Sequence, residues 1–138
     1  MNMEEEFMGL LIRWVLGFKN GKNCPRIYKE LFKELYPVEL HLLRNKICPF
    51  CGRKFKKKSG LAKHILGNYR DGCKIKFDAM LHNLFQIYRI YLKYIQYDYV
   101  NGHPVYRIRH PNGYNIICYT VRNAVAIFVN EILKTIGF

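Results

Sequence analysis

Apolar residues recur at helical spacing in the N-terminal third of the chain. One stripe runs from Phe7 to Phe18 and a second from Ile27 to Leu35, so that side chains three and four positions apart fall on one helix face. Pro37 breaks the second stripe, and residues 38–44 leave room for one further short helix. The pattern predicts a helical segment over residues 1–45.

A second set of elements follows near the C-terminus. Asp78 is a good N-cap, and residues 78–99 are apolar on nearly every side, which predicts a buried helix that Asn101-Gly102 ends. Two runs of strand-forming residues, 103–108 and 114–120, predict a β-hairpin. An apolar stripe over residues 121–136 predicts a closing amphipathic helix.

A change in charge marks off the middle of the chain. The 138 residues carry a formal net charge of +13, and residues 46–76 hold ten lysines and arginines against one aspartate. We therefore expect three parts, namely 1–45, the basic segment 46–76, and 77–138. The charge favours a polyanionic partner, with nucleic acid as the first choice. The length excludes a large two-domain enzyme, and the 50% of hydrophobic residues excludes overall disorder.

Cysteine usage and the lack of a long apolar run indicate the compartment. No run of 18 uncharged apolar residues occurs, and the stripe that begins at Phe7 contains Arg13 and follows three glutamates, unlike a secretory signal. We expect a cytoplasmic protein without membrane contact, in the host cytoplasm if the source is a virus. In a reducing compartment, five cysteines that include a Cys-Pro-Phe-Cys tetrad at residues 48–51 indicate a metal site, with zinc as the hypothesis.

Five positions of the basic segment share the spacing of a known metal motif. Cys48 and Cys51 are separated by two residues, and twelve residues lie between Cys51 and His64. Phe55 follows the second cysteine by four positions, and Leu61 precedes the histidine by three. This spacing resembles that of the ββα zinc-finger family, over residues 48–73 only. The resemblance implies a bound Zn²⁺ that orders the segment, with Phe55 and Leu61 as its small core.

The fourth ligand departs from the family pattern, which usually places a second histidine three to five residues after the first. Here the next suitable ligand is Cys73, with eight residues between it and His64. Gly67 would end the finger helix, and Gly72 would turn the chain so that Cys73 returns to the ion. The predicted ligands are Cys48, Cys51, His64 and Cys73, and the candidates that could replace Cys73 at the fourth position are Asp71, His82 and Cys24. The remaining interpretation is that the cysteines are buried thiols beside an unrelated histidine.

The resemblance also implies a way of binding DNA. In the family, the helix enters the major groove, and the positions that face base edges correspond here to Lys57, Gly60 and Lys63. Gly60 has no side chain, so we expect little base discrimination and an affinity that comes mainly from phosphates. Seven further basic residues are expected near phosphates: Arg53, Lys54, Lys56, Lys58, Arg70, Lys74 and Lys76. The alternative is a solvated basic face without a partner.

The predicted C-terminal hairpin offers a second contact. Arg107 and Arg109 alternate onto one strand face, which would let the hairpin touch the DNA backbone or minor groove as a wing. The alternative is an ordinary sheet edge that arginines keep soluble. Cys24 and Cys118 are expected in the core, or in a mutual disulfide if the source is a hyperthermophile.

These features predict a mostly α (α+β) protein. A ββα zinc finger lies between N-terminal and C-terminal helices, and one β-hairpin lies in the C-terminal half. We interpret the chain as a zinc-finger protein that binds double-stranded DNA, a small transcriptional regulator that acts alone or as a homodimer. The main alternative is a protein–protein interaction or oligomerisation module with a purely structural zinc, and RNA binding is a third interpretation.

No catalytic constellation emerges from the sequence. The other histidines lack an acid pair or a serine or cysteine partner at motif spacing, and a His-Asn-His nuclease would need an Asp-His dyad that does not follow at the right place. We expect no enzymatic activity. The composition, with one serine, two glutamines and eleven tyrosines, resembles that of small proteins of viruses that infect hyperthermophilic archaea.

Overall fold

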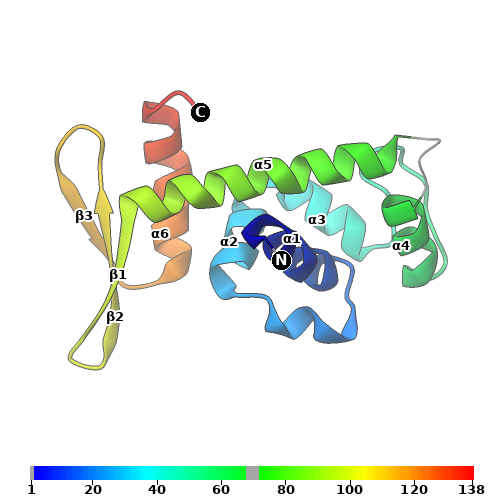
Figure 1. Ribbon diagram of the computed structural model, residues 1–138, viewed down its shortest axis with the longest axis horizontal. Helices are drawn as coiled ribbons and strands as arrows, with labels where there is room; N and C mark the ends of the chain where they lie inside the picture. Colours follow the sequence, from blue (N-terminus) through cyan, green and yellow to red (C-terminus); the bar gives the residue numbers. More distant parts are fainter. Residues whose placement is uncertain (1, 68–71) are drawn as a thin grey trace. The chain divides into compact units, whose positions relative to one another are not determined.

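The computed structural model describes residues 2–67 and 72–138, which are mostly helical with one three-stranded antiparallel sheet. The chain divides into two compact units, and the boundary between Phe85 and Gln86 falls inside one long helix. Figure 1 shows the order of the elements along the chain. No helix in the described ranges is both long enough and apolar enough to cross a membrane.

The first unit is built from helices. In chain order they are α1 (Met3–Val15), the 3₁₀ helix η1 (Lys19–Asn23), α2 (Arg26–Leu35), α3 (Pro37–Arg44), α4 (Lys58–Gly67) and the first part of α5 (Cys73–Tyr94). The Asn2 side chain caps α1 by accepting a hydrogen bond from the Glu5 N–H at 2.7 Å. Pro37 begins α3, where its missing N–H costs no helical hydrogen bond. The helices predicted over residues 1–45 are thus confirmed.

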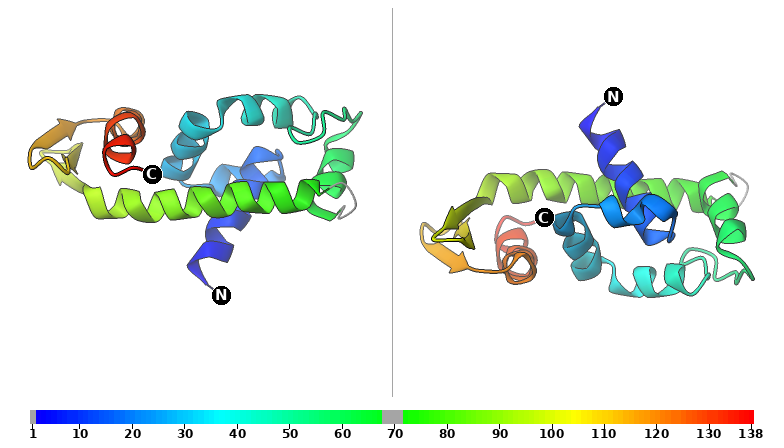
Figure 2. Two further views of the ribbon diagram at one scale, coloured as in Figure 1. Left: turned by 90° about the horizontal axis from the view of Figure 1, so that it is seen from above. Right: turned by 90° about the horizontal axis from the view of Figure 1, so that it is seen from below.

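The core of the first unit lies where α1, α2 and α5 meet. The Phe7 ring on α1 lies 4.5 Å from that of Tyr28 and 5.3 Å from that of Phe85, between ring centroids. Both views in Figure 2 show α1 crossing the first part of α5. Fully buried side chains surround this crossing and extend toward α4: Phe7, Leu11, Leu31, Phe32, Leu61, Ile65, Phe77, Leu81 and Leu84.

A close approach joins η1 to the end of α1. Gly21 is buried, and a Cβ atom at this position would lie 2.8 Å from the Arg13 carbonyl oxygen and 2.9 Å from the Trp14 Cα. The Phe18 N–H also donates to the Arg13 carbonyl, at 2.8 Å. Only glycine therefore lets the chain fold back onto α1 at this point.

The second unit contains the sheet. Strands β1 (Ile95–Val100), β2 (His103–Arg109) and β3 (Asn115–Cys118) pair in the order β1-β2-β3. Asn101 and Gly102 connect β1 to β2 with φ angles of 52° and 80°, which is the backbone of a two-residue type I′ hairpin turn. The predicted hairpin of residues 103–108 and 114–120 is confirmed, because β2 and β3 pair antiparallel. The prediction of a helix up to residue 99 was wrong, because residues 95–100 form a third strand and Asn101-Gly102 turns a strand rather than ending a helix.

Helix α5 also begins earlier than predicted. It starts at Cys73, so Asp78 lies inside the helix and is not its N-cap. Asp78 instead accepts a hydrogen bond from the Lys74 ammonium at 2.8 Å, one turn away.

The C-terminal helix packs within the second unit. The Thr120 hydroxyl caps α6 (Val121–Ile127) by accepting from the Asn123 N–H, and the helix continues as a π-helical segment, η2 (Phe128–Leu133). The predicted apolar stripe is buried at six positions: Val121, Ala124, Val125, Phe128, Ile132 and Leu133. The Tyr91 ring on α5 meets Phe128 edge to face, with 5.2 Å between centroids. The predicted closing helix is confirmed.

Candidate metal centre

A tight turn carries the first two cysteines. The Cys48 N–H donates to the Arg53 carbonyl at 2.9 Å, and the Gly52 N–H donates to the Cys48 carbonyl at 2.8 Å. Gly52 has a φ of 79°, a conformation that glycine adopts without steric cost. Within the described chain, this turn contains one antiparallel bridge, between Ile47 and Lys54, and no strand. The ββ part of the predicted finger is thus a single bridge.

Helix α4 supplies the histidine. The structure describes the helix as far as Gly67, and Leu61, His64 and Ile65 lie on its buried side. The His64 ring packs at 5.1 Å from the ring of Phe55, and a Cβ on Gly60 would lie 3.3 Å from the same phenyl ring. Gly60 and His64 are one turn apart and face Phe55 together. The position predicted to face bases at Gly60 therefore points into the segment's own packing.

The first residue of α5 supplies the last ligand. Gly72, with a φ of 70°, turns the chain immediately before Cys73, as the sequence predicts. Asp71 and Arg70 lie outside the described residues. His82, a second candidate for the fourth ligand, is exposed and bonded to Glu4, and Cys24 is a buried free thiol. The structure therefore brings Cys73, and neither His82 nor Cys24, to the cluster.

The four predicted ligands converge on one point. The Sγ atoms of Cys48, Cys51 and Cys73 and a ring nitrogen of His64 all lie within 4.8 Å of one another. Cys51 Sγ lies 3.4 Å from His64 Nε2. For a tetrahedral ion with bonds of about 2.3 Å to sulfur and about 2.0 Å to nitrogen, these two atoms would be about 3.5 Å apart. The cluster therefore has the dimensions needed to hold one metal ion.

The cluster is closed on three sides. Cys48, His64 and Cys73 are buried, and Cys51 is the exposed member. The pKa of Cys51 is lowered, mainly because the Arg53 backbone N–H donates a hydrogen bond to the sulfur and so favours the thiolate. Burial, followed by hydrogen bonds with the neighbouring thiols, raises the pKa of Cys73 to about 12. A cation at the centre of the cluster would instead lower the pKa of Cys73, because it stabilises the thiolate.

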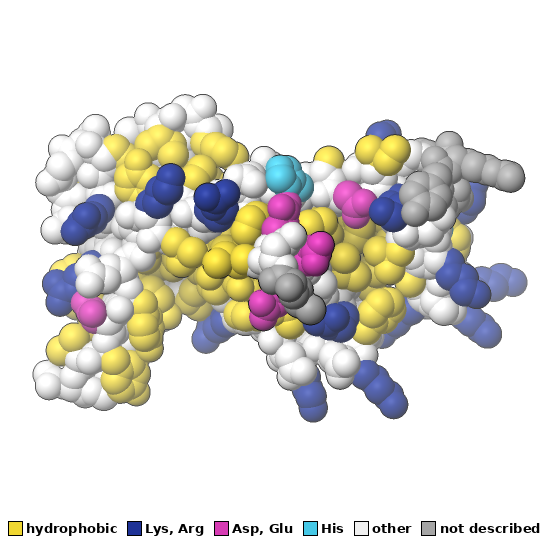
Figure 3. Space-filling view, in the orientation of Figure 1, with side chains coloured by type: hydrophobic (Ala, Val, Ile, Leu, Met, Phe, Trp, Pro, Cys, Tyr) yellow, Lys and Arg dark blue, Asp and Glu magenta, His cyan; other side chains and the backbone are white. Residues whose placement is uncertain are grey.

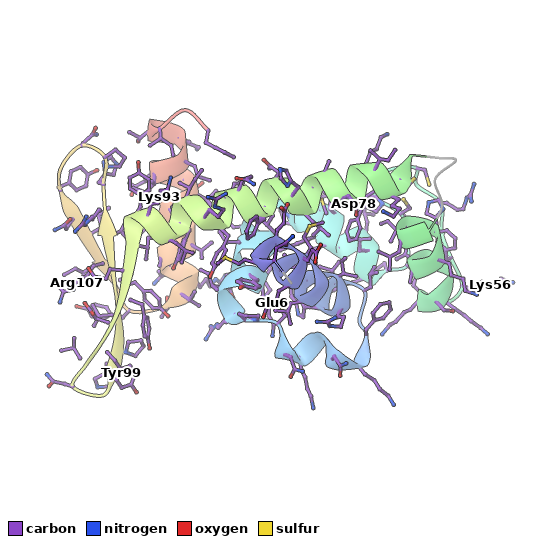
Figure 4. All side chains as sticks on the ribbon, viewed as in Figure 1. Glu6, Lys56, Asp78, Lys93, Tyr99 and Arg107 are labelled. Carbon is purple, nitrogen blue, oxygen red and sulfur yellow. The ribbon has the colours of Figure 1, made fainter. Side chains whose placement is uncertain are left out.

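Most of the predicted phosphate contacts are exposed in the first unit. Six lysines near the cluster have no acidic partner among the described residues: Lys54, Lys56, Lys57, Lys58, Lys63 and Lys76. Arg53 is exposed as well, whereas Lys74 is occupied by Asp78. Figure 4 shows Lys56 projecting away from the ribbon near α4, and Figure 3 shows Lys and Arg side chains gathered at that end of the unit.

Lys58 also has a local role. Its ammonium nitrogen lies 3.0 Å from where a Cβ on Gly17 would be, just beyond the C-terminal end of α1. The free carbonyls at a helix C-terminus carry partial negative charge, so the Lys58 charge complements this end. Sequence reasoning missed this contact because Gly17 and Lys58 are far apart in the chain.

Arg107 and Arg109 belong to the second unit. Both are exposed on β2, and they share one face of the sheet because they are two residues apart. The Arg107 guanidinium donates to the Asp98 carboxylate at 2.9 Å. The structure thus confirms that the two arginines are on one strand face, and it adds an acidic partner for one of them.

The donor set of the cluster is three thiols and one imidazole. Soft thiolate ligands in a fourfold arrangement are typical of structural sites for zinc and related ions. Comparison of the chain with protein-family models, with curated proteins and with solved structures gave no match.

Proposed function

We propose that the protein binds Zn²⁺ through Cys48, Cys51, His64 and Cys73 and uses the ordered segment to bind double-stranded DNA as a small regulator of transcription. The observation that carries the proposal is the convergence of four donor atoms within 4.8 Å. Zinc accepts this set of donors in a closed tetrahedral site, and such sites order small segments rather than catalyse reactions. The ion would hold the Cys48 turn, α4 and the start of α5 together.

The basic surface supports DNA as the partner. The lysines around the cluster remain without acidic partners in the described chain, so their charges are available to phosphates. Lys57, which directly precedes α4, and Lys63, in the middle of α4, are both exposed. Each phosphate that such a side chain neutralises releases counterions, which makes the affinity depend steeply on salt. Because Gly60 faces Phe55, base discrimination from α4 would be weak.

A salt-titrated gel shift with duplex DNA tests this function. Replacing Lys57 and Lys63 together with alanine should weaken binding and reduce the dependence of the affinity on salt. The double variant Lys19→Ala/Lys22→Ala is the matched control, because it removes two exposed lysines of η1 in the same unit. Equal effects of the two double variants, or no shift with any duplex at low salt, would contradict the proposal.

A protein-interaction module is the second candidate. Tyr97, Tyr99 and Val100 on β1 are 56%, 66% and 43% exposed, which is unusual for apolar side chains that lie so close together. Binding through such a surface would respond little to salt. Sedimentation of the protein with and without duplex at 50 and 300 mM salt, about a sixfold range, separates the two candidates because only the DNA complex should dissociate.

A further inference from the structure

A pocket lies in the second unit where α5 passes into β1. It encloses about 310 Å³, a size at the lower end of small-molecule sites. Its polar lining combines three cations with two amides: Lys93, Arg107, Arg109, Gln96 and Asn115. Tyr94 and neighbouring aliphatic side chains form the rest of the wall.

The sheet register holds the polar groups together. Gln96 pairs with Arg107 across β1 and β2, and Asn115 pairs with Arg109 across β2 and β3. Directly opposed residues share a face, so these four side chains form two adjacent rows on one side of the sheet. Lys93 joins them from the last turn of α5, and Figure 4 labels Lys93 and Arg107 on these two elements. The three cations thus come from two elements, α5 and β2, and the fold brings them to one pocket.

No acidic side chain lines the pocket. Asp98 binds Arg107 at 2.9 Å, but within residues 2–67 and 72–138 neither Lys93 nor Arg109 has an acidic partner. Like charges that are held close together repel one another, and a bound anion would remove this repulsion. Arginine side chains also present paired N–H donors that match the oxygens of a phosphate.

We propose that this pocket binds the phosphate of a nucleotide, either free or as one unit of a nucleic-acid strand. A phosphate alone would leave much of the volume unfilled, whereas a nucleotide also offers a sugar and a base to the tyrosine and aliphatic wall. The site is made entirely by the second unit, so it does not depend on the metal cluster or on the function proposed for it.

Calorimetric titration of the full-length, zinc-loaded protein tests the pocket with three probes, namely inorganic phosphate, adenosine 5′-monophosphate and a single-stranded 12-nucleotide DNA. Arg109→Gln and Lys93→Gln should each weaken binding of the nucleotide or the DNA about tenfold, since a charge-assisted hydrogen bond is lost. Arg122→Gln is the matched control. Arg122 is an exposed arginine of α6 in the same unit and does not line the pocket, so this variant should change the affinity less than twofold.

Asp98→Asn provides a test of opposite sign. Asp98 competes with the anion for Arg107, so its neutral variant should bind the same probe several-fold more tightly. A variant that had merely lost its fold would bind more weakly, so tighter binding cannot come from misfolding.

The probes identify the source of the phosphate. Tight binding of the mononucleotide identifies a free nucleotide, and a variant effect seen with the DNA alone identifies a strand. The proposal is overturned if no probe binds the wild type, or if Arg109→Gln behaves like Arg122→Gln. Binding of the mononucleotide should be unchanged in Lys57→Ala/Lys63→Ala, so failure of the DNA function and failure of this pocket remain distinguishable.

Discussion

Cys73 is the most informative of the four predicted ligands, because the ββα zinc-finger spacing that the sequence resembles does not supply it. It joins the cluster from the first residue of α5, while the other three come from the Cys48 turn and α4. Loss of a residue that hydrogen-bonds to a metal ligand typically lowers metal affinity roughly 10–100-fold. Replacing Cys73 with serine removes a predicted ligand itself, so zinc affinity should fall by more than this. Native mass spectrometry measures the bound metal directly.

The control for that experiment is Cys24→Ser. Cys24 is a buried thiol of the same unit that lies outside the cluster. Its serine variant should keep one zinc ion per chain, even if it is somewhat less stable. Retention of zinc by Cys73→Ser at wild-type affinity would show that another group completes the site.

The buried hydroxyl of Tyr91 predicts that one substitution will stabilise the second unit. Its hydroxyl is buried and has no hydrogen-bond partner among the described residues, and burial raises the pKa of the phenol well above its usual value. Tyr91→Phe removes an unsatisfied polar group and keeps the ring contact with Phe128. The free energy of unfolding of the second unit should rise by about 1 kcal/mol. Native-state hydrogen exchange on the β2 amides measures this quantity.

A matched comparison is Tyr36→Phe. The Tyr36 hydroxyl accepts a hydrogen bond from the Asn83 side chain at 2.8 Å. Removing it should lower the stability of the first unit by up to about 1 kcal/mol. A loss of similar size in Tyr91→Phe would reveal a partner for its hydroxyl, such as an ordered water.

The roles of single residues were predictable where a metal site requires its ligands at fixed spacings along the sequence. The separations between Cys48, Cys51 and His64 limited the site to a few combinations, and Cys73 followed because Gly72 could turn the chain before it. The orientation of Gly60 toward Phe55 was not predictable, because it depends on how α4 rotates against the turn. Lys93 was missed as a pocket residue because the predicted helix extended past the point where β1 begins.

At the scale of elements, the junction between α1 and η1 is the most constrained feature. Gly21→Ala would place a methyl group 2.8 Å from a backbone oxygen. Because backbone cannot move aside as a flexible side chain can, we expect a loss of about 1–3 kcal/mol in the stability of the first unit. Thermal unfolding followed by circular dichroism detects a change of this size.

Gly67→Ala controls for the general effect of replacing glycine. A Cβ on Gly67 meets no atom of the described residues within 4 Å, and Gly67 is the last described residue of α4. Its alanine variant should be neutral or slightly more stable, because alanine favours helix. Equal stability of the two variants would mean that the backbone at residue 21 relaxes freely.

The helices with a clear period and the β2–β3 hairpin were predicted, whereas strand β1 was not. The stripes of the N-terminal helices and of α6 follow a 3.6-residue repeat, so their burial could be anticipated. Residues 95–99 alternate apolar Ile95, Tyr97 and Tyr99 with polar Gln96 and Asp98, which is a strand pattern. The run is short and directly follows the apolar positions of α5, so it was interpreted as a continuation of the helix. The Asn-Gly pair carried the missing information, because it forms a hairpin turn as readily as it ends a helix.

At the scale of the whole molecule, the two units should respond differently to loss of metal. The cluster lies in the first unit, and the sheet lies in the second. Treatment with a chelator should speed hydrogen exchange in α4 and around the Cys48 turn, because the proposed ion would hold these two parts together. The amides of β1 and β2 should keep their protection.

Addition of zinc to the chelated protein serves as the control, and it should restore the exchange rates of α4. Uniform loss of protection in both units would indicate that the second unit cannot stay folded unless the first is intact. Unchanged exchange in α4 would mean that the segment folds without an ion, which contradicts the role proposed for zinc.

Because Cys51 is exposed, reagents and ions in solution would reach the metal site from its side. Three donors are shielded by protein, and one sulfur faces solvent. Soft electrophiles, peroxides and competing ions such as cadmium would all arrive from this side, and an incoming ion would displace the resident one by first capturing that sulfur. The proposed zinc ion would therefore exchange through the Cys51 side of the cluster, and a bulky residue placed beside Cys51 should lengthen the time that the ion stays bound.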